Sequence, residues 1–224
     1  MPVERHVLVV FPHPDDESFG AAGAIALHTR AGAPVTYLCG TLGEMGRNMG
    51  KPFFATRETL PLVRERELYD ACAVLGIDDL RQMGLRDKTI EFEDQQVLAA
   101  RIAAVIEEIQ PSLMITHYPG HGVHPDHNAL GAAAIRATTL IAPERRPVIH
   151  AHAISANREE ALGRPDVVLD LADVLDVKLA AIRAHRSQSE AMLAELEKEF
   201  NRDPAVRKRG MRNWRQEMYW TYHA

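Results

Sequence analysis

The sequence is poor in cysteine and in aromatic residues, and its charge is not that of a nucleic-acid-binding protein. Cys39 and Cys72, the two cysteines, lie in apolar segments without a CxxC spacing, so we expect buried, reduced thiols rather than a disulfide. A formal net charge of −5 argues against a nucleic-acid partner, whose binding surface would be basic. The basic run within residues 202–215 is better explained as a solvated helical face.

Long apolar runs and a dinucleotide-binding glycine motif are also missing. The apolar stretch at residues 6–11 is too short for a secretory signal or a membrane span, so we expect a cytoplasmic protein with no membrane partner. No GxGxxG follows that stretch, which removes the usual cradle for a dinucleotide. Hydrophobic and charged contents of 46% and 25% are ordinary for a globular chain with a substantial core.

What the sequence does contain is an alternation of strand and helix patterns. Residues 6–11 form a continuous β-branched run typical of a strand buried on both faces. Residues 18–30 have helical spacing, and residues 34–39 predict a second strand, which together have the length of a right-handed parallel crossover. We therefore expect a single α/β domain over residues 1–224, with a Rossmann-like, mostly parallel sheet flanked by helices.

The same alternation continues along the chain. Strands are predicted at residues 79–83, 112–116, 148–155 and 167–169. Helices are predicted at residues 57–75, 94–109, 128–140 and 172–200, the last with a break near 187–189. Residues 40–56 contain four glycines and no clean period, and a loop of that length is usually functional. The aromatic segment after Pro204 is expected to dock on its own domain or on a neighbouring subunit.

Two polar clusters follow predicted strands. His13–Glu17 comes directly after the first strand, and a histidine-rich segment at residues 117–127 follows the strand that ends at Thr116. Ligands of open parallel sheets bind beyond the carboxyl ends of the strands, so we expect both clusters to contribute to one site.

The residue types in these clusters suit a catalytic zinc ion. His13 and Asp16 are three residues apart and can face the same way at a helix entry, as can His124 and His127. One of the two later histidines could bind the metal while the other faces the substrate. Two histidines and a carboxylate, with a spare acid and a spare histidine, are suited to metal-assisted hydrolysis. Either cluster alone could be structural, for example a helix N-cap, but two at strand ends favour metal binding.

Four landmarks also resemble a known family. HPDDE at residues 13–17, TLGEMG at 41–46, HPDH at 124–127 and KLAAIRAHRSQ at 178–188 occur in the order found in the LmbE / PIG-L family of N-acetylglucosaminyl deacetylases. Residues 40–72 look most like the bacillithiol biosynthesis deacetylases, which resemble enzymes acting on N-acetylglucosaminyl-malate. The resemblance implies a zinc-dependent N-deacetylase that hydrolyses the acetyl amide of such an amino-sugar conjugate.

The resemblance also divides the clusters into roles. His13, Asp16 and His127 would be the zinc ligands, although Fe²⁺ or Co²⁺ would accept the same donors. Asp15 would be the general base that takes a proton from the attacking water. The residues alone do not distinguish Asp15 from Asp16, or His124 from His127.

Two further catalytic roles are implied within HPDH. His124 would be protonated, would stabilise the tetrahedral oxyanion and would assist departure of the amine. Asp126 would orient His124 and raise the pKa of its imidazole, as an adjacent carboxylate does.

Substrate contacts are expected from residues outside the two clusters. Arg64 matches a family arginine that looks like a sugar-hydroxyl ligand. Glu44 and Arg47, in the glycine-rich loop, could meet a polar or anionic substrate such as a malyl group, or could lie on a solvated surface. His185 and Gln188 match a late HxSQ element, which would either line the site or tie the last helix to the sheet.

One departure and two alternatives accompany the resemblance. Some relatives carry a tyrosine two positions before HPDH, where this chain has Gly122, so no catalytic tyrosine is assigned. His121 also receives no role.

Two alternative functions remain open. They are an amidase acting on a conjugate of a low-molecular-weight thiol, and a metal- or sugar-binding module without turnover. The resemblance further suggests a homo-oligomer, either a trimer or a hexamer.

Overall fold

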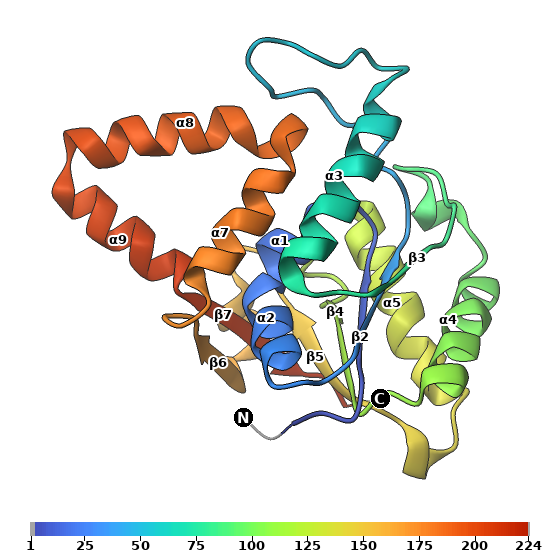
Figure 1. The fold of residues 1–224 in the computed structure, drawn as a ribbon. Helices are drawn as coiled ribbons and strands as arrows, with labels where there is room; N and C mark the ends of the chain where they lie inside the picture. The colour runs from blue at the N-terminus through green and yellow to red at the C-terminus, as the bar shows by residue number, and fades with distance from the viewer. Residues whose placement is uncertain (1–2, 224) are drawn as a thin grey trace.

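The computed structural model describes residues 3–223, which form a seven-stranded sheet covered by helices on both faces (Figure 1). The strand order is β3-β2-β1-β4-β5-β7-β6. The strands are β1 Val7–Phe11, β2 Val35–Cys39, β3 Asp79–Gln82, β4 Leu113–His117, β5 Val148–His152, β6 Val167–Asp170 and β7 Gln216–Thr221. The first five strands in chain order are parallel, and β7 is antiparallel to both of its neighbours. The predicted α/β fold with a mostly parallel sheet is therefore confirmed.

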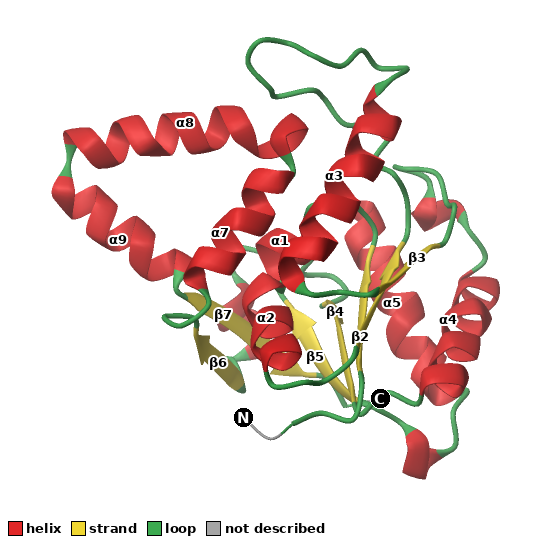
Figure 2. Cartoon of the chain, in the orientation of Figure 1, coloured by secondary structure: helices red, strands yellow, loops and turns green. Residues whose placement is uncertain are grey.

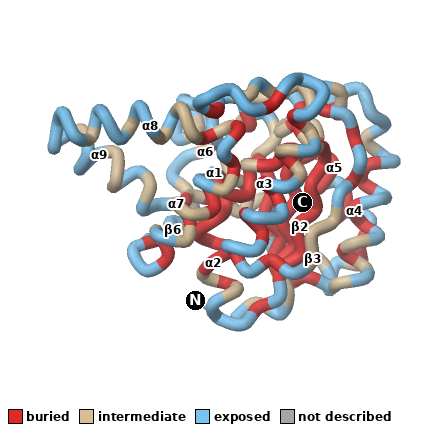
Figure 3. Tube along the Cα trace, turned by 45° about the horizontal axis from the view of Figure 1, so that its top comes forward, coloured by how far each residue is buried: buried red, intermediate tan, exposed pale blue. Residues whose placement is uncertain are grey.

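Along the chain, one or more helices connect each strand to the next. Figure 2 shows these helices beside the sheet. The α-helices are α1 Asp16–Gly20, α2 Ala22–Arg30, α3 Leu60–Leu75, α4 Gln95–Ile109, α5 Pro125–Thr139, α6 Arg158–Leu162, α7 Leu175–Ala184, α8 Arg186–Arg202 and α9 Pro204–Trp214, with 3-10 turns η1 Ile90–Phe92 and η2 Pro143–Arg145. Helices α8 and α9 project from the body and are mostly exposed (Figure 3).

The central strand β1 separates two apolar cores. Leu8 and Val10 pack with helices α4 and α5 on one face, whereas Val7, Val9 and Phe11 pack with α2, α3 and α7 on the other. All five side chains are completely buried, which is why this strand has a continuous apolar run instead of an alternating pattern. The carboxyl end of β1 is thereby fixed where the HPDDE segment begins.

Several helix boundaries differ from the predicted ones, and two of these differences matter for the site. The predicted helix at 128–140 begins earlier, at Pro125, because the Nδ1 atom of His124 accepts the backbone N–H of Asp126 at 3.1 Å and caps the helix. The predicted helix at 18–30 starts at Asp16 and is split into α1 and α2 at Ala21. The break predicted near 187–189 falls at residue 185, between α7 and α8.

The C-terminal segment docks on its own domain, the first of the two predicted outcomes. Strand β7 inserts between β5 and β6, and Tyr219 becomes completely buried. The carboxylate of Glu217 accepts the backbone N–H groups of Gly23 and Ala24 at 2.8 Å each, and Lys178 donates to it at 2.7 Å. The sequence did not predict this strand, whereas the exposed helix α9 coincides with the basic run at residues 202–215 that was interpreted as a solvated helical face.

The expectations for the glycine-rich segment and for the two cysteines are also confirmed. No helix or strand lies between Cys39 and Leu60, so the glycine-rich segment is a loop, which arches over the top of the molecule in Figure 1. Cys39 and Cys72 are both free and buried. Within residues 3–223, no helix combines the length and apolar character needed to cross a membrane.

Candidate active site

The two polar clusters meet at the carboxyl end of the sheet. β1 and β4 are neighbouring parallel strands, so the segments that follow them leave the sheet side by side. His13–Glu17 leads into α1, while His124 caps α5 and puts Asp126 and His127 on its first turn. This topology agrees with the expectation that both clusters contribute to one site at the carboxyl ends of the strands.

Three side chains have donor atoms at the spacing of a metal site. The Nδ1 atom of His13 lies 3.3 Å from Nε2 of His127 and 3.4 Å from Oδ2 of Asp16, and Nε2 of His127 lies 3.2 Å from Oδ1 of Asp16. In a tetrahedral zinc site, bonds of about 2.0–2.1 Å separate the donors by roughly 3.3–3.4 Å. The donor atoms of His13, Asp16 and His127 therefore have a spacing compatible with a zinc-sized ion, with the two Asp16 distances measured to different carboxylate oxygens.

The outer nitrogens of both histidines are already hydrogen-bonded to acceptors. Nε2 of His13 lies 3.2 Å from Oδ2 of Asp126 and 3.1 Å from Oδ1 of Asp87, and Nδ1 of His127 lies 2.8 Å from the carbonyl of Gly122. Because these partners only accept, each outer nitrogen carries a proton, and in the neutral imidazole the inner nitrogen then presents a lone pair. Metal-binding histidines are typically oriented in this way.

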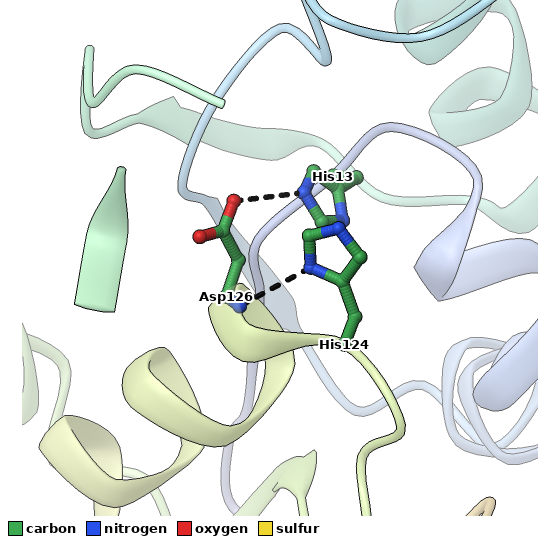
Figure 4. A group of neighbouring side chains, drawn as sticks. All are labelled: His13, His124 and Asp126. Atoms are coloured by element: carbon green, nitrogen blue, oxygen red, sulfur yellow. Dashed lines mark hydrogen bonds and ion pairs between the residues drawn. The ribbon is translucent and has the colours of Figure 1, made fainter. Parts of the chain in front are cut away.

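A second group of possible ligands, His13, His124 and Asp126, overlaps the first (Figure 4). Its weakness is that the Asp126 carboxylate is already occupied: Oδ2 accepts the backbone N–H of Lys88 at 2.6 Å and Oδ1 accepts that of Ile90 at 3.2 Å. In the first group Asp16 accepts one backbone N–H, that of His13 at Oδ2 at 2.9 Å, whereas both oxygens of Asp126 accept one, so we favour the first group.

Electrostatics also favour a cation here. Burial opposes charge on His13, but the carboxylates of Asp126, Asp16 and Asp87 outweigh it and raise the His13 pKa well above its usual value. The pKa of Asp16 is held well below its usual range, since His127, His117 and His13 outweigh the effect of its burial.

Asp15 lies beside this group in an unusual backbone conformation. Its φ of 98° is in the left-handed region, and its side chain is 20% exposed. Arg64 donates from Nη2 to Oδ2 of Asp15 at 3.1 Å. Burial raises the pKa of Asp15 to about 6, although Arg64 acts in the opposite direction. A carboxylate with such a pKa is suited to general base catalysis near neutral pH.

His124 and Asp126 make a different contact from the expected one. The N–H that donates to Nδ1 of His124 is the backbone amide of Asp126, while the Asp126 carboxylate points to His13 (Figure 4). The pKa of His124 is lowered, first by burial and then by His13 and His127, and Asp126 offsets this only in part. The expected contact between the Asp126 carboxylate and the His124 imidazole is therefore replaced by a contact from the Asp126 backbone. The lowered pKa makes the His124 imidazole neutral before substrate binds.

Arg64 is buried under the glycine-rich loop. Its guanidinium donates to the carbonyls of Gly43, at 3.0 Å, and of Pro14. Gly43 has a φ of +63°, and a Cβ there would overlap the guanidinium; a Cβ at Gly46 would lie 2.9 Å from Nη1. These glycines let the loop close over Arg64.

Of the other two residues predicted to contact substrate, Arg47 lines the cavity above the metal-binding group and Glu44 does not. Arg47 is exposed and lines a cavity of about 460 Å³ above the metal-binding group. This cavity is lined by His13, Asp15, Asp16, Met45, Gly46, Arg47, Arg64, Asp87, Lys88, His124 and His127. Glu44 does not line it, and its carboxylate accepts the backbone N–H of Asp87 at 3.1 Å instead.

The late HxSQ element ties segments together instead of lining the cavity. Nε2 of His185 donates to Oε1 of Glu17 at 2.6 Å, and Gln188 donates to the carbonyl of Arg47 at 3.0 Å. The Nδ1 atom of His121 is hydrogen-bonded to Oγ of Ser155 at 2.8 Å.

Two residues of the site were not singled out from the sequence. Asp87 follows β3 at the same edge of the sheet, so its position after a predicted strand was an available signal. His117, at the end of β4, stacks on the ring of His127 with centroids 4.0 Å apart, and burial lowers its pKa to about 4. Because His117 is neutral, it packs against His127 without adding a positive charge that would repel the cation.

Fold and site together define a class: an α/β protein with a possible metal-binding group, a neighbouring acid and an open cavity, as metal-assisted hydrolysis requires. The chain belongs to the PIG-L family, since the family model described as GlcNAc-PI de-N-acetylase matches residues 8–138. The resemblance inferred from the sequence is thus confirmed.

Individual proteins with similar sequences show which members of the family this chain resembles. A protein of Bacillus cereus named probable N-acetyl-alpha-D-glucosaminyl L-malate deacetylase 2 is 57% identical over 98% of this chain and 99% of its own length. Its Bacillus subtilis counterpart is 56% identical over 98% of each chain. The diacetylchitobiose deacetylase of Thermococcus kodakarensis is 29% identical over 82% of this chain and 70% of its own.

Solved structures support the fold. N,N'-diacetylchitobiose deacetylase from Pyrococcus horikoshii matches 98% of this chain and 84% of its own, with a TM-score of 0.73 at 23% identity. The 4-carboxy-2-hydroxymuconate hydratase GalB from Pseudomonas putida matches 98% and 97%, with a TM-score of 0.72 at 24% identity. Because a deacetylase and a hydratase share this fold, the reaction must be inferred from the site.

Proposed function

We propose that this protein is a metal-dependent N-deacetylase that hydrolyses the acetyl amide of an N-acetylglucosaminyl conjugate, with N-acetylglucosaminyl-malate as its substrate. The observation that carries the proposal is the spacing of the donor atoms of His13, Asp16 and His127, with Asp15 beside them in an open cavity. The high identity to the two Bacillus proteins supports the choice of substrate.

In this proposal His13, Asp16 and His127 hold zinc, and Fe²⁺ or Co²⁺ would be accepted by the same donors. When bound, the metal polarises the amide carbonyl and makes water more acidic. Asp15 takes the proton of the attacking water, for which a pKa of about 6 is well matched. Arg64 holds the Asp15 carboxylate at 3.1 Å and, as a member of the cavity lining, is also within reach of the sugar hydroxyls.

His124 is proposed to stabilise the negative charge that develops on the amide oxygen. Since its Nδ1 accepts the backbone N–H of Asp126, the proton of the neutral ring is on Nε2, which is then a donor toward the cavity. A donor of this kind contributes about 3–4 kcal/mol to stabilisation of the transition state. The amine departs with the proton that Asp15 took from the water, and the His124 ring assists by keeping its Nε2–H on the former amide oxygen. Asp126 supports both histidines, His13 through its carboxylate and His124 through its backbone.

An anionic aglycone is supported by a second cavity. It has a volume of about 510 Å³, and Met45, Gly46, Arg47 and Lys88 line both cavities. Its lining includes the cations Arg47, Arg57 and Lys88 and no carboxylate among the described residues. We propose that Arg47 contacts the malyl carboxylates here, whereas Glu44 acts indirectly through Asp87.

The experiment that tests the function measures acetate release by the zinc-loaded protein. Substrates are N-acetylglucosaminyl-malate, its dimethyl ester and an amide conjugate of a low-molecular-weight thiol. We expect turnover of the first and a much higher KM for the neutral ester. Preference for the thiol conjugate would replace the substrate assignment, and no release from any of them would favour a binding module.

A variant assigns the base. Asp15→Asn should retain one zinc per chain and lose about 10²–10⁴-fold in kcat, the usual contribution of a general base. Loss of stoichiometric zinc from this variant would instead make Asp15 a ligand.

The proposal also includes a cytoplasmic location and a trimeric or hexameric assembly. Light scattering at working concentration measures the assembly directly, and a monomer would remove that part of the proposal.

A further inference from the structure

The backbone of Asp15 is held in a conformation that a side chain bearing a Cβ rarely adopts. Its φ of 98° and ψ of −28° place it in the left-handed region immediately before helix α1. Such a residue costs free energy and persists only where its surroundings enforce it. The position of the Asp15 carboxylate therefore depends on whatever fixes its backbone.

One buried carboxylate makes that connection. Oε2 of Glu17 accepts the backbone N–H of Asp15 at 3.0 Å, and Glu17 is completely buried. Its other oxygen, Oε1, accepts the hydroxyl of Ser18 at 2.6 Å and Nε2 of His185 at 2.6 Å. His185 is also completely buried.

His185 reaches Glu17 from a distant part of the chain, 168 residues away. It lies at the junction of α7 and α8, and its carbonyl accepts the backbone N–H groups of Gln188 and Ser189 at 2.9 Å each. A helix junction is a fixed point, so the imidazole can orient the Glu17 carboxylate rigidly.

We infer that Glu17 and His185 are positioning residues for Asp15, which hold its backbone so that its carboxylate faces the cavity. The inference rests on the proposed role of Asp15 as base. Without the acceptor on Glu17, the amide of Asp15 loses its partner and φ can relax, which withdraws the carboxylate from the cavity and from Arg64. A purely structural ion pair would have no such link to Asp15.

The chain offers a matched control for this idea. Glu67 is another buried carboxylate that fastens the same late element, since it accepts the N–H and the hydroxyl of Ser187 at 2.7 and 2.6 Å. Its carboxylate contacts Ser187 and not Asp15 in the hydrogen bonds of the described residues. Glu67→Leu therefore removes a buried carboxylate without removing the support of Asp15.

The experiment compares Glu17→Leu, Glu17→Gln, His185→Leu and His185→Gln with Glu67→Leu, using zinc-loaded full-length protein and N-acetylglucosaminyl-malate. We expect kcat of Glu17→Leu to fall about 10²-fold, as a displaced catalytic group does, with KM and zinc content unchanged. Glu17→Gln keeps an acceptor for the Asp15 amide, and His185→Gln keeps a donor for Glu17, so each should recover most of the kcat lost in its Leu variant. Glu67→Leu should lose thermal stability but keep kcat.

Two outcomes would overturn the inference. One is a kcat for folded, zinc-loaded Glu17→Leu equal to that of Glu67→Leu; the other is a loss of zinc, which would locate the effect at Asp16. Adding Glu17→Leu to Asp15→Asn should cause no further fall in kcat, and a further fall would show that Glu17 acts elsewhere.

A measurement that does not depend on catalytic activity tests this inference separately from the proposed function. Amide hydrogen exchange at Asp15 should accelerate in His185→Leu but not in His185→Gln, whether or not the enzyme releases acetate. Unchanged exchange in both variants contradicts the positioning role. Inactive wild-type protein, or full activity of Asp15→Asn, contradicts the proposed function instead. If Glu17→Leu does not fold, the His185 pair still decides the question.

Discussion

Replacing Asp126 with asparagine separates two possible roles of this residue. Its carboxylate contacts Nε2 of His13 at 3.2 Å, whereas only its backbone N–H contacts His124. If the residue acts mainly through His13, the substitution weakens metal binding. If it acts through the charge of His124, the substitution lowers kcat at saturating metal. The geometry predicts the first result.

The size of the effect follows from the hydrogen bonds of the two oxygens. Oδ2 accepts from His13 and from the backbone of Lys88, and Oδ1 accepts from the backbone of the buried Ile90. An asparagine that keeps its oxygen at the Oδ2 position turns its NH₂ toward the Ile90 amide. One buried bond is then lost, at a cost of about 1–3 kcal/mol in the free energy of unfolding.

Metal affinity should fall by about ten- to a hundredfold, as it does when the partner of a ligating histidine is changed. We expect the lower end of that range, because Asp87 still accepts from Nε2 of His13 at 3.1 Å. Removal of Asp87 as well should bring the full loss. Competition with a chromophoric chelator measures the zinc Kd, and kcat is then measured at saturating zinc. An unchanged Kd together with a large fall in kcat would refute this reasoning.

Three other predictions use different parts of the structure. Gly43→Ala forces a Cβ against the guanidinium of Arg64 at a φ of +63°, so it should raise KM severalfold and lower the unfolding midpoint, and an unchanged KM would contradict the packing. Lys178→Met leaves the buried Glu217 carboxylate without its cation and should cost about 3–5 kcal/mol in denaturant unfolding, with kcat unchanged for the folded fraction. Because the base Asp15 must be ionised, activity should rise as pH increases through its pKa, which burial raises to about 6 in the metal-free protein and which a bound cation lowers; an acid limb of kcat/KM above pH 6 would contradict this assignment.

Sequence patterns predicted the parts of the fold that depend on local chemistry. The apolar run of β1 and the carboxylates and histidine that follow it are adjacent in the chain, so the strand and the first half of the site could be inferred together. The second half was assigned to the same site because it also follows a predicted strand, and the structure adds that β4 is the parallel neighbour of β1. Family resemblance, and not spacing, distinguished Asp15 from Asp16.

The features that escaped prediction depend on partners far away in sequence. Strand β7 is stabilised by its neighbours β5 and β6 and by the contact of Glu217 with helix α2, none of which is visible in its own mixed polar and aromatic pattern. The Asp126 carboxylate turns to His13 because two backbone amides after Asp87 hold it there. Its neighbour in sequence, His124, receives only the helix-capping contact.

The same long-range contacts explain how a metal-binding group on short connections can be rigid. His13 is fixed through Asp87, which follows β3, and through Asp126 on α5, while the Asp15 amide is fixed through Glu17 to the junction of α7 and α8. Each of these supports comes from an element that is anchored in one of the two cores. A small displacement of a supporting element would therefore move a ligand or the base directly, and errors of about 1 Å in such positions cost about 10²-fold in rate. Substitutions at residues that do not contact the substrate should for this reason alter turnover more than substitutions at the exposed cations around the cavity.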